Sequence, residues 1–273
     1  MREIITGNFA PWRLVLWPPS SIRIVDWNID RGLRLPEILD FLGSTNADIL
    51  TLQEVDINAR RTHQLNIAQE IARPLQMNYV FGLEFQELTQ GSRASPAYHG
   101  QATLSRWPIS NPRLIRFQKQ SNFWRPHWFL PQIEPFQERL GGRIALVSDI
   151  DIAGEKIVSY NLHLESRGND DLRLAQMDEV LRDAMGHHPG GSLIVAGDFN
   201  LDISRHRTME HAGFRDAVPT ARVASTPPRG LLEGGRHIDW AFVRGPMQTN
   251  GGQIHQSVKA SDHYPISFNL RRA

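Results

Sequence analysis

Strand-like runs alternate with helix-like runs along this sequence, and the strand-like runs are clearly more numerous. Strands are expected at residues 22–28, 48–55, 79–85, 100–107, 143–152, 156–164, 192–196, 238–243 and 265–270. Helices are expected at 36–42, 65–75 and 170–184, where apolar residues recur at helical spacing. The runs 143–152 and 156–164 form a predicted hairpin around Ala153-Gly154-Glu155. This excess of strands favours an α/β fold of two packed mixed sheets flanked by helices over one parallel sheet.

Size and composition restrict the possible functions. The chain has 273 residues, 40% of them hydrophobic, which suits one large domain, expected at 22–273. It contains no cysteine, which excludes a disulfide scaffold, a thiolate zinc site and a cysteine nucleophile. The formal net charge is +1, so no global positive field attracts nucleic acid, and a polyanionic partner would need a local patch.

The N-terminal segment, residues 1–21, is apolar but short. Arg13 and three prolines interrupt it, and it lacks the basic, apolar and small-residue regions of a signal peptide. We expect it to pack on the domain. Without a signal peptide or a run of about 18 apolar residues, a cytoplasmic location is the default expectation.

Residues 118–142 form a long stretch with little periodicity and many aromatic residues. A loop of this length in a compact domain is usually functional or disordered, and the aromatic content argues against disorder. Two interpretations stay open. The loop either folds back on the core or forms a lip over the active site that touches the substrate.

Polar side chains end one strand after another. They are Asn28, Glu54, His163, Asp198, Asn200, Asp239, Asp262 and His263. Any one of them would ordinarily be a turn residue, a helix cap or a buried polar residue, so the prediction depends on their number. Oxygen ligands suit a hard divalent cation, imidazole transfers protons near neutral pH, and ligand crevices lie beyond strand ends. Together they predict metal-assisted cleavage of a phosphate ester.

Seven short motifs give the chain a strong resemblance to the endonuclease/exonuclease/phosphatase superfamily. They are Trp27-Asn28-Ile29, Leu52-Gln53-Glu54-Val55, Gly100 to Pro108, Asn161-Leu162-His163-Leu164, Gly197-Asp198-Phe199-Asn200, Ile238-Asp239-Trp240 and Ser261-Asp262-His263. The resemblance runs from about Ile22 to Leu270. It implies the family's deoxyribonuclease I-like fold, a four-layered α/β/β/α sandwich.

The resemblance also implies a role for each residue at the strand ends. Glu54 would bind Mg²⁺ or Mn²⁺, with Asn28 beside it and Asp262 near the ion. Asp198 and Asn200 would surround the scissile phosphate and the attacking water. His263, oriented by Asp239, would be a general base or acid, and His163 would donate to a phosphoryl oxygen. Whether Asp198 or His263 takes the proton of the water stays open.

Further residues are candidates for contact with the substrate or for support of the site. Arg143 is predicted to bind a substrate phosphate or merely to begin a strand, and Trp124 and Trp128 are predicted to stack on the substrate. The carboxylate that supports His163 is either Glu84 or Glu87.

Three substrate hypotheses follow. The first is a phosphodiesterase acting on nucleic acid, favoured by the arginines in predicted loops. The second is a phospholipid phosphodiesterase that inserts the aromatic loop into a membrane. The third is a binding module without turnover, which the complete set of expected residues disfavours. No protein partner is implied.

Overall fold

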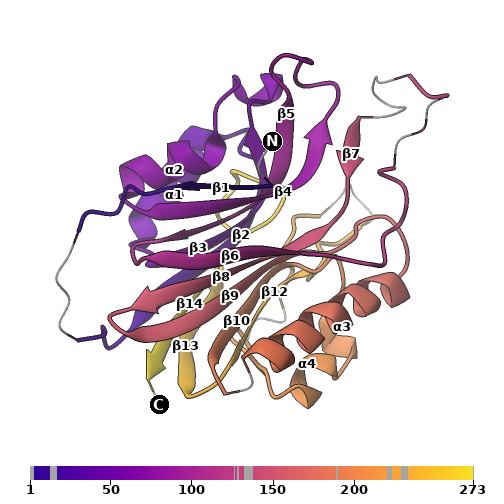
Figure 1. Ribbon diagram of the computed structural model, residues 1–273. Helices are drawn as coiled ribbons and strands as arrows, with labels where there is room; N and C mark the ends of the chain where they lie inside the picture. Colours follow the sequence, from indigo (N-terminus) through magenta and orange to yellow (C-terminus); the bar gives the residue numbers. More distant parts are fainter. Residues whose placement is uncertain are drawn as a thin grey trace.

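The strands form two mixed sheets that pack face to face (Figure 1). The computed structural model describes residues 3–12, 17–125, 127, 129–131, 138–188, 190–219, 223–228 and 233–272. The first sheet has the order β1-β4-β5-β3-β2-β14-β13, with β7 also paired to β4. Its strands are β1 (Ile4–Gly7), β2 (Ile22–Arg31), β3 (Ile49–Ile57), β4 (Asn78–Glu87), β5 (Ala97–Ser105), β7 (Arg139–Gly141), β13 (Met247–Ile254) and β14 (Ile266–Arg272).

The second sheet has the order β11-β12-β10-β9-β8-β6. Its strands are β6 (Ile109–Arg116), β8 (Ile144–Ile152), β9 (Glu155–His163), β10 (Ser192–Asp198), β11 (Arg215–Asp216) and β12 (Asp239–Arg244). Strands β8 and β9 form the predicted antiparallel hairpin. Strands β1, β6, β7, β11 and β13 were not predicted. They are short or only partly buried, and their sequences carry a weak strand pattern.

Helices cover the outer face of each sheet (Figure 1). They are α1 (Leu35–Thr45), α2 (Ile67–Leu75), α3 (Asp170–His187) and α4 (Thr208–His211), with short 3₁₀ turns at Arg60–Thr62 and Ile203–Arg205. Helices α1 and α2 bury their apolar side chains on the first sheet, and α3 and α4 bury theirs on the second. The result is the predicted four-layered α/β/β/α sandwich.

Local sequence explains where helices α2 and α3 begin. The Asn66 side chain accepts a hydrogen bond from the Gln69 amide at 3.1 Å, and Asn169 accepts one from Leu172 at 3.1 Å. Each asparagine therefore satisfies a backbone donor that the first helical turn leaves free. Asp170 and Asp171 add negative charge at the start of α3, where the helix dipole favours it.

A third apolar cluster fills part of the layer between the sheets. Its members include Ile22, Ile24, Ile49, Ile150, Ile157, Ile194, Ala241, Ile266 and Phe268. Side chains alternate between the two faces of a strand, so residues two positions further along β2, β9 and β10 extend the same layer. There the layer becomes polar and leads to the candidate site.

The N-terminal segment contributes a strand to the first sheet. β1 pairs antiparallel with β4, and Phe9 stacks on Tyr79 with ring centroids 6.3 Å apart. The sequence predicts that residues 1–21 pack on the domain, and β1 and Phe9 belong to that segment. Residues 13–16 lie outside the described part. None of the described helices is long and apolar enough to span a lipid bilayer.

Candidate active site

Strand register brings three of the predicted residues to one edge of the second sheet. Asp198, at the end of β10, is the register partner of His163 on parallel β9 and of Asp239 on antiparallel β12. Gly197 precedes Asp198 with φ +144°, and a Cβ there would lie 2.0 Å from the Leu162 carbonyl oxygen. Only glycine allows this close approach of β10 to β9.

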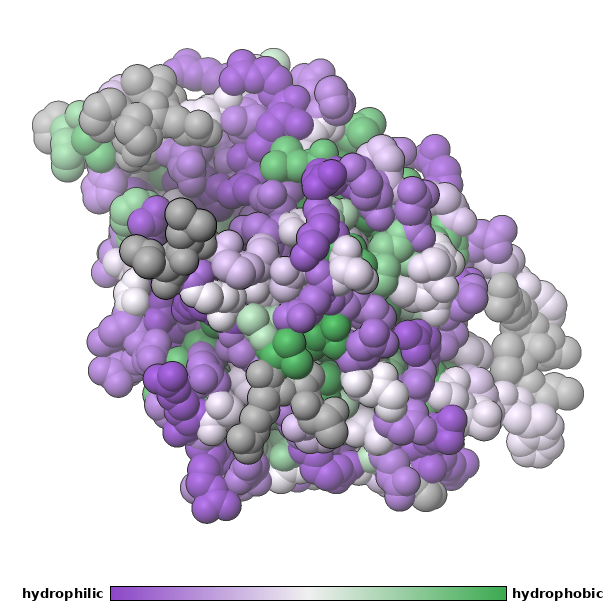
Figure 2. Space-filling model, turned by 180° about the vertical axis from the view of Figure 1, so that it is seen from behind, coloured by the Kyte–Doolittle hydropathy of each residue, from purple (hydrophilic) through white to green (hydrophobic). Residues whose placement is uncertain are grey.

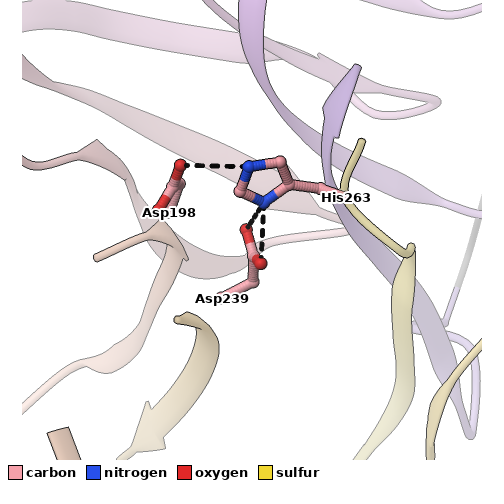
Figure 3. A group of neighbouring side chains, drawn as sticks. All are labelled: Asp198, Asp239 and His263. Atoms are coloured by element: carbon pink, nitrogen blue, oxygen red, sulfur yellow. Dashed lines mark hydrogen bonds and ion pairs between the residues drawn. The ribbon is translucent and has the colours of Figure 1, made fainter. Parts of the chain in front are cut away.

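His263 reaches this edge from the first sheet. Its loop is held to β2 by two hydrogen bonds: Trp27 Nε1 donates to the His263 carbonyl at 2.9 Å, and Ser261 Oγ donates to the Asn28 carbonyl at 2.7 Å. The imidazole Nδ1 lies 2.8 and 2.9 Å from the two Asp239 oxygens. Its Nε2 lies 3.7 Å from Asp198 Oδ2, so the ring sits between two carboxylates (Figure 3).

The two carboxylates keep His263 protonated. Burial by itself lowers the pKa of an imidazole, but Asp239 and Asp198 outweigh it and raise the pKa of His263 to about 10. His263 is therefore an imidazolium at neutral pH, with a proton on each ring nitrogen. Asp239 also accepts a hydrogen bond from Ser225 Oγ at 2.6 Å, which holds the carboxylate in place.

Asp198 is the centre of the arrangement. Its Oδ1 accepts a hydrogen bond from the Asn200 amide at 2.8 Å, and its Oδ2 accepts one from Asn28 Nδ2 at 3.2 Å. His163 Nε2 lies 3.6 Å from the same Oδ2. Asn200 has φ +51°, and its Nδ2 donates to the Leu164 carbonyl at 3.1 Å. The structure thus brings Asn28, His163 and Asn200 together around one buried carboxylate.

An irregularity in β3 turns Glu54 toward the same edge. The β3 register shifts between Leu52 and Val55 against β5, and Glu54 itself has φ +51°. Such bulges re-aim side chains next to active sites. Burial would raise the pKa of Glu54, but nearby Arg31, His99, His163 and Arg143 hold it well below its ordinary value. Glu54 is therefore a carboxylate at any physiological pH.

The groups around Glu54 fit a hard divalent cation. Its oxygens lie 3.7 Å from Arg31 Nη2 and 4.0 Å from His163 Nε2, beyond hydrogen-bond distance, and its side chain is 19% exposed. Burial and the charges of Asp262 and Glu54 raise the pKa of Asp30, against the opposing charge of Arg31. Asn28 Oδ1 faces the Asp30 amide at 3.1 Å. Oxygen donors and concentrated negative charge are what Mg²⁺ or Mn²⁺ requires.

A second group of potential ligands suits a cation less well. Ligand atoms of Asp198, Asp239 and His263 lie within 4.8 Å of one another. The His263 imidazolium already pairs with both carboxylates, because it faces Asp239 with one nitrogen and Asp198 with the other. A metal ion there would have to displace that proton and break the Asp239 hydrogen bond. The residues near Glu54 are therefore the better candidates.

Two of the predicted substrate-binding residues, Arg143 and Trp124, are buried. Arg143 is 3% exposed and contacts His163 and Glu84. Trp124 is 7% exposed; its Nε1 donates to Glu165 at 3.4 Å, and its ring packs against Phe85. The Arg139 guanidinium also lies 5.2 Å from the Trp124 ring centroid, so this residue folds back on the core, and stacking of Trp124 on a substrate stays a prediction. Trp128 lies outside the described residues.

The carboxylate beside His163 is Glu84, one of the two predicted candidates. Glu84 Oε2 lies 3.6 Å from His163 Nδ1, whereas Glu87 pairs with Arg61 and Arg139. Burial would raise the pKa of Glu84, but His163 and Arg143 lower it to about 2. No sequence motif on β4 distinguishes Glu84 from Glu87. Only the packing of the two sheets shows that Glu84 is the carboxylate beside His163.

Sequence reasoning also missed residues at the edges of the site. Arg31 bridges Asp30 at 2.5 Å and approaches Glu54, and buried Asp26 lies below Asn28 on the same face of β2. A cavity of about 360 Å³ opens beside Asn200. Its lining is mostly polar and charged, and includes Asp170, Asp202, Arg205, Arg236 and His237. The alternation along β2 could have suggested Asp26, which lies two positions before Asn28. No local sequence pattern identifies Arg31 or the residues that line the cavity.

Comparison with known proteins places the chain among enzymes of one family. A model of the Endonuclease/Exonuclease/phosphatase family matches residues 27–263. Tyrosyl-DNA phosphodiesterase 2 from Xenopus laevis is 37% identical over 71 residues, which are 26% of this chain. That match covers 19% of the relative, about one fifth of its length.

Solved structures share the fold at low sequence identity. An endonuclease/exonuclease/phosphatase from Beutenbergia cavernae superposes with a TM-score of 0.66 at 18% identity, covering 93% of this chain and 72% of that one. TDP2 from Caenorhabditis elegans gives 0.59 at 19% identity, with 92% and 75% covered. The human Nocturnin catalytic domain, solved with a bound sulfate anion, gives 0.66 at 16% identity, with 99% and 97% covered.

Proposed function

The chain belongs to the endonuclease/exonuclease/phosphatase family, and on that premise we propose that it is a divalent-metal-dependent phosphodiesterase acting on nucleic acid. The observation that carries this proposal is Asp198, a buried carboxylate within 3.7 Å of both His163 and His263 at the edge that also presents Glu54. Endonucleases, exonucleases and phosphatases all cleave phosphate ester bonds.

Asp198 is the group best placed to accept the proton of the attacking water. His263 cannot do so at neutral pH, because Asp239 and Asp198 keep it an imidazolium. It acts instead as a cationic donor that stabilises negative charge developing on the phosphoryl oxygens. Asp239 orients the ring through Nδ1, and Asn28 and Asn200 hold the two oxygens of Asp198 in position.

Glu54, Asn28 and Asp262 would hold the cation. Asp262 is exposed at the rim of the site, next to His263. When bound, Mg²⁺ or Mn²⁺ supplies positive charge that polarises the phosphate and stabilises the transition state. His163 adds a hydrogen-bond donor on the side of Asp198 that faces Glu54.

The shape and polarity around the site favour nucleic acid over phospholipid. The cavity beside Asn200 is lined by arginines, acids and His237, which suits phosphates and bases better than acyl chains. The lipid hypothesis relied on an aromatic loop; Trp124 of that loop is buried, whereas Phe123 and Phe129 are exposed, so the polar cavity and not the loop favours nucleic acid. On the face seen in Figure 2 the described residues are mainly hydrophilic, with hydrophobic ones in small separate patches.

The proposal is tested with the purified protein, Mg²⁺ or Mn²⁺ and a panel of substrates. The panel contains plasmid DNA, single-stranded DNA, RNA, sphingomyelin and a chromogenic phosphodiester. It also contains a tyrosine-linked DNA oligonucleotide, because one relative is a tyrosyl-DNA phosphodiesterase. We expect metal-dependent cleavage of at least one nucleic acid. Turnover of sphingomyelin alone would overturn the choice of substrate.

Glu54→Gln separates metal binding from the rest of the site. Removing one negative charge should weaken Mn²⁺ binding in calorimetry and raise the metal concentration needed for half-maximal activity, by about 10- to 100-fold. Glu37→Gln, an exposed change on α1, is the control and should alter neither value. Unchanged Mn²⁺ affinity in Glu54→Gln would show that the cation site lies elsewhere.

A further inference from the structure

We propose that Arg143 is a positioning residue that fixes His163 in the tautomer carrying its proton on Nε2. This inference rests on the proposed function only in treating His163 as a donor to a phosphoryl oxygen. The tautomer itself is a property of the resting protein. The tautomer of His163 can therefore be tested without any substrate.

The contact between the two side chains determines which atom donates. Arg143 Nη1 lies 2.8 Å from His163 Nδ1, and both residues are buried. A guanidinium has only donors, and it stays protonated in proteins. His163 Nδ1 must therefore accept the hydrogen bond with its lone pair. The ring proton is then on Nε2.

The other side of the ring agrees with this assignment. His163 Nε2 faces Asp198 Oδ2 at 3.6 Å and Glu54 Oε1 at 4.0 Å, and both are acceptors. An Nε2–H points into a region of negative charge, whereas an Nε2 lone pair would face it and be repelled. The same Nε2–H is the atom available to a phosphoryl oxygen that enters between the two carboxylates.

Glu84 would impose the opposite tautomer if Arg143 were absent. Its Oε2 lies 3.6 Å from His163 Nδ1 and 3.4 Å from Arg143 Nη1. A carboxylate accepts, so a His163 paired directly with Glu84 would carry its proton on Nδ1. The three atoms form a triangle, and Arg143 Nη1 makes its shortest contact, 2.8 Å, with the Nδ1 lone pair. The choice between Arg143 and Glu84 thus decides whether Nε2 is a donor.

Arg143 is held firmly enough to make that choice. Its Nη2 donates to Ser166 Oγ at 3.1 Å, and its guanidinium lies 5.3 Å from the Phe85 ring centroid. The Gln120 side chain bonds both its backbone amide, at 3.0 Å, and its carbonyl, at 2.8 Å. This network holds the Arg143 guanidinium against His163, while a contact of Arg143 with a substrate phosphate stays a prediction.

Nitrogen-15 NMR of histidine-labelled protein tests the proposal, because the two tautomers give different ring-nitrogen shifts and couplings. The chain has 11 histidines, and His163→Gln identifies the signal. In the wild type we expect His163 to carry its proton on Nε2. In Arg143→Met we expect the proton on Nδ1, paired with Glu84, and kcat lowered about 10- to 100-fold. Arg143→Lys keeps one donor and should restore the Nε2–H tautomer in part.

Arg139→Met is the matched control. Arg139 is also buried, lies 5.4 Å from the same Phe85 ring and pairs with Glu87, but it does not contact His163. The control should be destabilised like Arg143→Met, yet keep the wild-type tautomer. A wild-type His163 with its proton on Nδ1, or on both nitrogens, would overturn the proposal. So would an unchanged Nε2–H signal in Arg143→Met. If that variant fails to fold, the wild-type and Arg143→Lys spectra decide.

Discussion

The layer between the two sheets is apolar at one end and polar at the other, although the same strands build both ends. Along β2 the inward side chains are Ile22, Ile24, Asp26 and Asn28; along β9 they are Ile157, Ser159, Asn161 and His163; along β10 they are Ile194, Ala196 and Asp198. Each series begins with isoleucine and ends in a residue of the candidate site. Along each of these strands the inward side chains therefore change from apolar core residues to polar residues of the candidate site.

The polar half of the layer is held by hydrogen bonds instead of apolar packing. Asp26 Oδ1 accepts from Thr51 at 2.7 Å and from Gln53 at 2.9 Å, and Gln53 Nε2 also lies 2.8 Å from Asn161 Oδ1. Asn161 donates to backbone carbonyls of β3 and β5 at 3.1 and 3.0 Å. These bonds couple the two sheets directly below Asp198. Buried polar networks of this kind specify geometry, whereas apolar packing supplies most of the stability.

The comparison predicts that substitutions at the polar end lower turnover, whereas substitutions at the apolar end lower the stability of the fold. At the polar end, His263→Gln removes the cationic donor, and kcat should fall about 10²- to 10³-fold while the fold persists. The folded state raises the pKa of His263 to about 10, so its contribution to stability is present below pH 6.5 and is lost as pH rises toward 10. Urea unfolding across that range should show a steeper fall in stability in the wild type than in the variant. His255→Gln, a half-buried control bonded to Ser267, should keep wild-type kcat.

At the apolar end, Phe268→Ala should have the opposite profile. Phe268 is fully buried between the sheets on β14, so its truncation leaves a cavity and should reduce the free energy of unfolding by about 3–5 kcal/mol. Turnover per folded molecule should not change, because no site residue loses a contact. Urea unfolding and active-site titration measure the two quantities. A large fall in kcat of the folded fraction would show that the ends are not separable.

Asp26 marks the boundary between the two ends. Burial raises its pKa to about 8 from 3.8, so the folded state binds a proton that the unfolded state has lost. Its contribution to stability is therefore complete below pH 4 and decreases as pH rises to 8, by at most about 1.4 kcal/mol per unit. Asp26→Asn should remove this dependence and be the more stable protein at pH 8. Asp40→Asn, an exposed control, should follow the wild type, and parallel pH curves for Asp26→Asn and wild type would refute the boundary role.

Alternation along single strands was readable from the sequence, and with it the class of fold. Strand-like runs identified the buried strands, and polar residues at their ends identified a site beyond them. Asn28, Asp198 and His263 therefore emerged as candidates without any knowledge of their contacts. Trp124 did not follow this logic, because an aromatic residue in an irregular stretch carries no period that distinguishes a buried position from an exposed one.

The partners of these residues were settled by tertiary structure alone. Trp27 anchors the loop of His263 across 236 positions, Asn28 reaches Asp198 across 170, and Glu84 approaches Arg143 across 59. Strand register and the packing of the two sheets set such distances, and no local pattern encodes them. Periodicity determined which side chains face inward toward the site, because it acts within one strand. Pairing between strands and sheets decided which atoms meet there.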